Sequence, residues 1–255
     1  MIDCHCHLEQ PEFDQSRDEI IKELQSKLKA VITCCSHPRD FELSLKLTKS
    51  WPGFVFCSAA IHPEYIKELS PSEIESFIEK IKVNRDSIAA IGETGLDFYW
   101  IKETELREKQ AWLFRKFIVL ARELDKPLVI HSRNASEEVI NLLEQEQMSN
   151  RAVLLHLFSE RKLLKRVIEN GWWISIGPGI ARSKDIKKIA RDMPLNKILL
   201  ETDSPWFAQQ GQAFGLPTNV FLVAEEIAKI KKLNIEEIER ATDENAIKFF
   251  KLPLC

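Results

Sequence analysis

The sequence predicts an α/β protein: a TIM-type (β/α)8 barrel that forms a single domain over residues 1–255. Eight short apolar runs recur along the chain, and amphipathic helical patterns separate them, which is typical of a closed barrel. No Gly-rich phosphate loop follows the first run, as an open doubly wound sheet would usually show. A length of 255 residues is ordinary for one such barrel.

The eight apolar runs are short and several are rich in Val and Ile, which suits strands buried on both faces. They cover residues 2–7, 30–35, 54–60, 88–93, 127–131, 152–156, 172–176 and 197–203. Apolar residues at helical spacing predict helices around 20–28, 74–81 and 103–124. After the eighth run, the pattern predicts a helix around 221–227 and several short helices across 235–250.

Composition limits the classes of partner. Hydrophobic residues make up 44% of the chain and charged residues 29%, with a net charge of −3. No apolar run reaches membrane-spanning length, and no targeting segment precedes the first strand, so we expect a cytoplasmic protein without a membrane partner. The slightly acidic balance argues against strong non-specific attraction to DNA.

The run Cys4-His5-Cys6-His7 resembles a zinc cluster at first sight. Side chains alternate along a strand, however, so the two histidines should share one face and the two cysteines the other. We therefore expect Cys4 and Cys6 to be packing residues, and all six cysteines to be reduced.

The histidines point to the chemistry. Most of the six lie on expected strands, at their ends or just after them: His5, His7, His62, His131 and His156. His37 has a less informative place after the second strand. Catalytic groups of a barrel gather at the C-terminal ends of its strands. A single histidine there is often an ordinary polar residue, but the joint pattern predicts a metal site.

Two carboxylates complete this set, because a buried acid without a partner is costly. Glu93 ends the fourth expected strand and Asp203 the eighth. Glu93 can bridge two ions, one oxygen to each, about 3.5–4 Å apart. His5, His7 and Asp203 would hold one ion, and the other would bind the remaining pair of strand-end histidines, His131 and His156. Imidazole is the commonest nitrogen ligand for zinc-like metals.

With these residues the sequence resembles the TatD family of metal-dependent deoxyribonucleases, in the amidohydrolase superfamily. The resemblance covers essentially the whole chain and rests on residues 3–8 (DCHCHL), 61–63 (IHP), 91–98 (IGETGLDF), 131–133 (HSR), 156–159 (HLFS) and 200–205 (LETDSP). Three features depart from the pattern of relatives. Ala60 stands where Gly is frequent, residues 216–219 (LPTN) replace an Arg-Asn-x-Pro segment, and Glu93 stands where some superfamily members carry a carboxylated lysine.

The resemblance implies two divalent ions, zinc as isolated with magnesium or manganese possible for activity. It implies metal ligation by His5, His7, Glu93, His131, His156 and Asp203. It also implies substrate contacts from His62 and Arg133.

We expect a hydrolase that cleaves DNA from 3′ ends, in the 3′-5′ direction, on single strands or frayed ends. Hydroxide would attack phosphorus in line, Asp203 would take its proton, and Arg133 with the metals would stabilise the developing charge. His62 would hydrogen-bond the phosphate or the leaving group. The loop aromatics that could stack bases are Trp100, Trp206 and Phe207.

Two other functions stay open. The same metals would serve an ester, lactone or amide hydrolase, including one that deacylates aminoacyl-tRNA. A non-catalytic binding protein would be expected to have lost metal ligands, and this chain keeps them. DNA is the expected substrate partner, and no obligate protein partner is evident.

Overall fold

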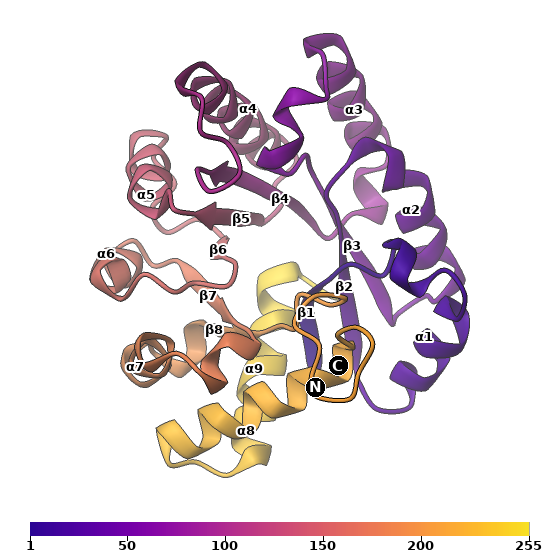
Figure 1. Ribbon diagram of the computed structural model, residues 1–255, viewed down its shortest axis with the longest axis vertical. Coiled ribbons are helices and arrows are strands. Elements are labelled where there is room, and N and C mark those ends of the chain that lie inside the picture. The colour runs from indigo at the N-terminus through magenta and orange to yellow at the C-terminus, as the bar shows by residue number, and fades with distance from the viewer. Residues whose placement is uncertain (255) are drawn as a thin grey trace.

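The eight expected strands form one parallel sheet, in the order β1 to β8, in the computed structural model, which describes residues 1–254. The strands are β1 (Ile2–Cys6), β2 (Ala30–Cys35), β3 (Val55–Ala59), β4 (Ala90–Asp97), β5 (Leu128–Arg133), β6 (Val153–Leu155), β7 (Trp173–Ile176) and β8 (Ile198–Leu200). The strands occupy the centre of the molecule and the helices surround them (Figure 1). The fold is the predicted (β/α)8 barrel.

The helices that cover the strands are α1 (Arg17–Gln25), α2 (Phe41–Ser50), α3 (Pro71–Val83), α4 (Thr104–Glu123), α5 (Ser136–Gln145), α6 (Leu164–Glu169), α7 (Lys184–Asp192) and α8 (Val220–Lys231). A further helix, α9 (Ile235–Phe250), lies behind the strands in the view of Figure 1. The expectation of several short helices there was wrong, because the stretch is one helix. It begins with a capping box in which Asn234 and Glu237 each bond the backbone of the other.

Two apolar layers hold the barrel together. One cluster packs residues of several strands, among them Ile2, Ile32 and Trp173, against Phe249 and Phe250 of α9. The larger cluster lies between the strands and the surrounding helices. Each fully buried large side chain of this kind stabilises the fold by about 1.5–3 kcal/mol. Trp173 is therefore a packing residue rather than a base-stacking platform.

The barrel is closed between β1 and the segment that follows β8. The Asp203 N–H donates to the His5 carbonyl (2.9 Å), and the His7 N–H donates to the Ser204 carbonyl (2.7 Å). The buried Asp3 carboxylate accepts the Thr202 N–H at 3.0 Å. Three of the predicted metal ligands thus lie on the seam of the barrel, where backbone hydrogen bonds fix their positions.

Strict alternation fails in β1. The pairing of β1 with β2 shifts register between Asp3 and Cys6, which marks a bulge. Cys4 consequently packs in the cluster that includes α9, whereas Cys6 packs in the outer cluster. The expectation that the two cysteines share one face was wrong, although both are buried packing residues with reduced thiols.

β4 extends four residues beyond its expected end, so Glu93 lies inside the strand and Asp97 ends it. Gly95 allows this extension, because a Cβ at that position would collide with the carbonyl of His131 on β5. The close approach brings β4 and β5 together where they carry the predicted site residues Glu93 and His131. Within residues 1–254, no helix is long and apolar enough to cross a membrane.

Candidate metal centre

A pocket of about 570 Å³ opens at the C-terminal ends of the strands. Most of the predicted site residues line it: His7, His62, Glu93, His131, Arg133, His156 and Asp203. His5 lies beneath the pocket and is completely buried. The structure therefore brings together all eight residues that the sequence singled out, from β1, β4 and β5 and from the segments after β1, β3, β6 and β8.

The backbone turns sharply where two of these side chains leave the barrel. Asp203 has φ +55°, and Leu157, directly after His156, has φ +45°. Non-glycine residues rarely adopt this left-handed conformation, which costs of order 1–3 kcal/mol and concentrates at functional sites. At both positions the packed barrel imposes the turn that directs a polar side chain into the pocket.

The two oxygens of Glu93 face two different groups of histidines. Oε2 lies 3.3 Å from His5 Nε2 and 3.9 Å from His7 Nε2. Oε1 lies 2.6 Å from His131 Nδ1 and 3.7 Å from His156 Nε2. One carboxylate can therefore offer one oxygen to each of two ions.

Asp203 completes the group around His5 and His7. Its Oδ1 lies 3.7 Å from His5 Nε2 and 3.5 Å from His7 Nε2, and those two nitrogens are 3.1 Å apart. The same oxygen lies 3.9 Å from His156 Nε2. Two groups of three residues each place their donor atoms close enough to bind one ion per group. They are His5, His7 and Asp203, and His5, Glu93 and His156.

Three of the histidines hold a carboxylate on their other ring nitrogen. Glu9 lies 3.0 Å from His7 Nδ1. Glu201 lies 2.7 Å from His156 Nδ1, and Asp97 lies 2.9 Å from His131 Nε2. Such partners fix which nitrogen of a metal-bound histidine carries the proton, and they raise its basicity as a ligand.

Sequence reasoning missed these three acids as functional residues. The signal was present in the spacing, because Glu9 follows His7 by two positions and Glu201 precedes Asp203 by two.

The buried carboxylates and histidines of the centre shift one another's pKa values. Burial opposes the ionised form of Glu93, but His156 and His5 outweigh it and hold the pKa of Glu93 well below its usual range. Burial also opposes the charged form of His156, yet Glu201 and Glu93 raise its pKa to about 10. Asp97 and Glu93 raise the pKa of His131 to about 9 in the same way.

A divalent cation fits this environment. Without it, protons on the histidines are the positive charges that balance the buried carboxylates. An ion replaces those protons, and the neutral imidazoles then become ligands. Imidazole nitrogens and carboxylate oxygens are the donors that zinc takes.

A third group of possible donors, His62, Asp97 and His131, is a weaker metal site. Asp97 already occupies Nε2 of His131 in a direct hydrogen bond. The remaining nitrogen of His131 points at Glu93, into the group described above.

His62 is held as a neutral ring. Its Nδ1 accepts the Glu64 N–H at 3.2 Å, so the proton lies on Nε2, which is 3.7 Å from Glu93 Oε1. Burial, together with the neighbouring His131, lowers the pKa of His62 to about 3. This geometry makes His62 a hydrogen-bond donor into the pocket rather than a proton acceptor.

Arg133 is exposed at the rim, and its guanidinium stacks on the ring of Tyr99 at 3.9 Å from the centroid. On the opposite side, Trp206 contacts His7 edge-on, with ring centroids 4.7 Å apart. Trp100, Trp206 and Phe207 are about half exposed. The pocket therefore has aromatic faces and one cation at its mouth.

Residues 216–219, which depart from the family pattern, are not among the residues that line this pocket. The Asn219 amide exchanges two hydrogen bonds with Gln212, at 3.0 and 2.9 Å. Its amide groups are thus occupied within the loop.

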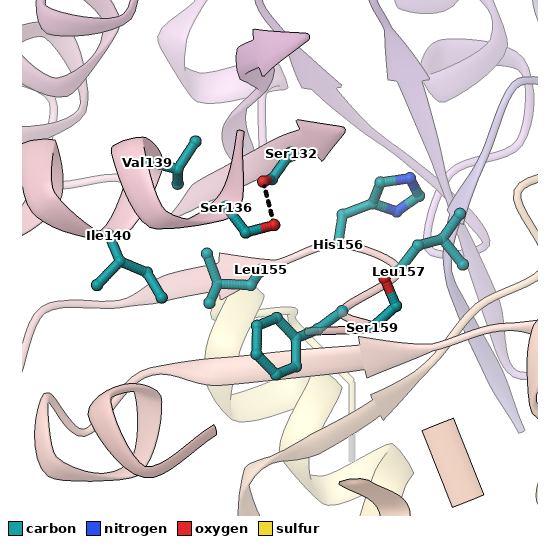
Figure 2. Close-up of a pocket in the computed structure, with 9 residues that line it drawn as sticks. Ser132, Ser136, Val139, Ile140, Leu155, His156, Leu157 and Ser159 are labelled. Atoms are coloured by element: carbon teal, nitrogen blue, oxygen red, sulfur yellow. Dashed lines mark hydrogen bonds between the residues drawn. The ribbon is translucent and has the colours of Figure 1, made fainter. Parts of the chain in front are cut away.

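A small cavity of about 10 Å³ lies beside His156, lined by residues of β5, α5 and the end of β6 (Figure 2). Ser132 and Ser136 bond each other across it at 2.8 Å. Its volume suits about one water molecule, so it is part of the packing around His156 and not a second ligand site.

Comparison with known proteins shows which family the chain belongs to. A family model described as TatD related DNase matches residues 2–251. The human protein Deoxyribonuclease TATDN3 is 35% identical over 98% of this chain and 94% of its own length. An uncharacterized metal-dependent hydrolase of Methanocaldococcus jannaschii, MJ1582, is 32% identical over 98% of this chain and 96% of its own length.

The solved structure of the TatD homologue YJJV from Escherichia coli has the same fold. It has a TM-score of 0.89 at 24% identity, covering 99% of this chain and 98% of its own. The resemblance seen in the sequence is thereby confirmed over its full length. The chain is a metal-dependent hydrolase and belongs to the TatD-related DNase family.

Proposed function

We propose that this enzyme is a deoxyribonuclease that removes nucleotides from 3′ ends of single-stranded or frayed DNA with two divalent ions, zinc as isolated. The observation that carries the proposal is the orientation of Glu93, whose two oxygens face separate histidine groups. That arrangement suits a pair of ions bridged by one carboxylate. The name of the human relative, a deoxyribonuclease, agrees with phosphodiester chemistry.

The ligands divide between the two ions. His5, His7 and Asp203 would hold one, and His131 through Nδ1 with His156 through Nε2 would hold the other, while Glu93 contacts both. When bound, two such ions supply Lewis acidity toward a phosphoryl oxygen and generate the attacking hydroxide at neutral pH.

Side chains of the protein would transfer the proton and contact the phosphate. Burial disfavours the ionised form of Asp203, but its contact with His7 outweighs this and lowers its pKa. Its carboxylate is therefore ionised at pH 7 and can accept the nucleophile's proton and return it to the leaving oxygen. His62 donates its Nε2 proton to the phosphate or to the leaving group. Arg133 pairs with the phosphate as charge develops.

The pocket mouth favours a single strand. Trp100 lies after β4, and Trp206 and Phe207 lie after β8, so these rings stand at different sides of the entrance. A base that stacks on such a ring gains about 1–3 kcal/mol, whatever its identity. A base pair would have to open before one strand entered a pocket of about 570 Å³. Hence we expect ends and single strands to be cleaved faster than blunt duplexes.

A substrate panel on zinc-, manganese- and magnesium-loaded enzyme tests the proposal. The panel holds an end-labelled single strand, its blunt duplex, a closed single-stranded circle, RNA, aminoacyl-tRNA and a simple aryl ester. The proposal predicts a ladder of products from the 3′ end of the single strand and an intact circle. Protein carrying Glu93→Gln, purified identically, controls for contaminating nucleases.

The same panel separates the rival activity. Cleavage of the circle at the rate of the linear strand would exclude dependence on ends. Turnover of the ester or of aminoacyl-tRNA without cleavage of any nucleic acid would instead identify an ester hydrolase that uses the same metals.

A further inference from the structure

Asp97, the last residue of β4, links two parts of the site through its two carboxylate oxygens. Its Oδ2 lies 2.9 Å from Nε2 of His131. Its Oδ1 accepts the backbone N–H groups of Tyr99 and Trp100, each at 2.8 Å. The residue is completely buried, so solvent does not replace either set of bonds.

The bond to His131 determines which atom of that ring is free. When Nε2–H donates to Asp97, Nδ1 keeps its lone pair, and Nδ1 is the atom 2.6 Å from Glu93 Oε1. A ligand histidine needs this arrangement, because only an unprotonated nitrogen can bind an ion.

The bonds to Tyr99 and Trp100 fix the turn at the rim. The Tyr99 ring carries the Arg133 guanidinium at 3.9 Å, and the Trp100 ring lies 5.5 Å from the same group. Asp97 also pairs in register with Arg133 across β4 and β5. Its carboxylate therefore sets where the stacking partners of Arg133 lie.

We propose that Asp97 is a positioning residue with two separable tasks. Oδ2 selects the tautomer of His131 that binds an ion, and Oδ1 holds the Tyr99–Trp100 turn that presents Arg133 to the substrate phosphate. This inference rests on the metal ligation proposed above. It makes one buried side chain responsible for both ion loading and substrate placement.

Asp97→Asn separates the two tasks. The amide oxygen still accepts the two turn N–H groups, but the amide NH₂ now faces His131 Nε2. That contact is favourable only if Nε2 is unprotonated, which puts the ring proton on Nδ1 and blocks the ion. Asp97→Ala removes both tasks. The fold should survive, because Gln110 holds the backbone of residue 97 through its N–H (3.2 Å) and its carbonyl (3.3 Å).

Three measurements test the inference, with Asp86→Asn as the matched control on an almost fully exposed carboxylate. Competition with a chromophoric chelator gives the affinity of each zinc ion. Fluorescence anisotropy gives binding of a labelled single-stranded oligonucleotide to metal-free protein. Long-range ¹H–¹⁵N NMR shows which nitrogen of His131 carries the proton in zinc-loaded protein.

We expect Asp97→Asn to weaken one of the two zinc ions by about 10- to 100-fold, with oligonucleotide binding unchanged. Asp97→Ala should weaken the same ion and also weaken oligonucleotide binding by roughly 10-fold. Tyr99→Ala should weaken only oligonucleotide binding, and Tyr99→Phe should restore it, since the ring stacks without its hydroxyl.

In zinc-loaded wild-type protein the proton should lie on Nε2 of His131. A proton on Nδ1 would place the ion between His62, Asp97 and His131 and overturn the inference. Equal loss of zinc and oligonucleotide binding in Asp97→Asn would refute the separation of tasks. Failure of wild-type protein to bind two ions would instead refute the proposed metal ligation, so the two failures are distinguishable.

Discussion

Glu93→Gln is the substitution that should disturb both ions at once. The wild-type carboxylate presents Oε2 to His5 and His7 and Oε1 to His131 and His156. Glutamine keeps the shape but removes the charge, and it turns an NH₂ group toward one of the two ions. The side chain is only 3% exposed, so the substituted amide stays between the two groups of histidines.

The size of the effect follows from the geometry of a bridging carboxylate. A zinc–oxygen distance is about 2.1 Å, and at an effective dielectric constant of about 20 a full negative charge at that distance from a divalent ion is worth roughly 16 kcal/mol. Half a charge per ion gives about 8 kcal/mol, or up to roughly 10⁶-fold in affinity for each ion. His131→Ala removes a ligand from one ion alone, so the other ion should keep its affinity within about 10-fold.

Zinc titration against a chelator of known affinity measures both constants in each variant. Circular dichroism of the metal-free proteins confirms that each variant folds. Loss of a single ion from Glu93→Gln, with the other at wild-type affinity, would refute the bridge, because that is the pattern of a ligand to one metal.

Three further predictions follow from the same structure. Arg133→Ala should lower kcat/KM on single-stranded DNA by roughly 10- to 100-fold with zinc affinity unchanged, and a parallel loss of zinc would contradict its rim position. Cys4→Ala and Cys6→Ala should each cost roughly 1–2 kcal/mol of stability in denaturant melts yet retain two zinc ions by elemental analysis, and loss of an ion from a folded variant would show that a thiol is a ligand. The pKa values of His131 and His156 are raised to about 9 and about 10, so the protonated rings stabilise the metal-free protein below pH 6.5, and this stability is lost as pH rises through those values. The Tm of the metal-free protein should therefore fall between pH 7 and 10 while zinc affinity rises. A flat Tm profile would contradict this.

The barrel was predictable because short apolar runs alternate with amphipathic helical patterns eight times along the chain. The site was predictable because several histidines fall at or just after the ends of those runs. Strand limits were less accurate. Glu93 was expected at the end of its strand, but Gly95 lets β4 continue beside β5 as far as Asp97. Likewise, nothing in the run Cys4-His5-Cys6-His7 marks the bulge in β1, since a bulge depends on how β1 pairs with β2.

The supporting acids show where single-sequence reasoning stops. Asp97 and Glu201 each contact a histidine that is distant in the sequence and that only the closed barrel brings near, whereas Glu9 contacts His7 two positions before it. The direction of a ring, and therefore the identity of its free nitrogen, is decided by such tertiary contacts. A residue's presence at a strand end can be read from the chain, whereas a hydrogen-bond partner on another strand cannot.

The central claim is that two divalent ions share Glu93. Anomalous scattering from zinc-loaded crystals of the wild-type protein, measured on both sides of the zinc absorption edge, tests it most directly. If two ions share Glu93, two peaks should appear about 3.5–4 Å apart, one beside His5, His7 and Asp203 and one beside His131 and His156, with Glu93 between them. One peak, or a second peak among His62, Asp97 and His131, would contradict it.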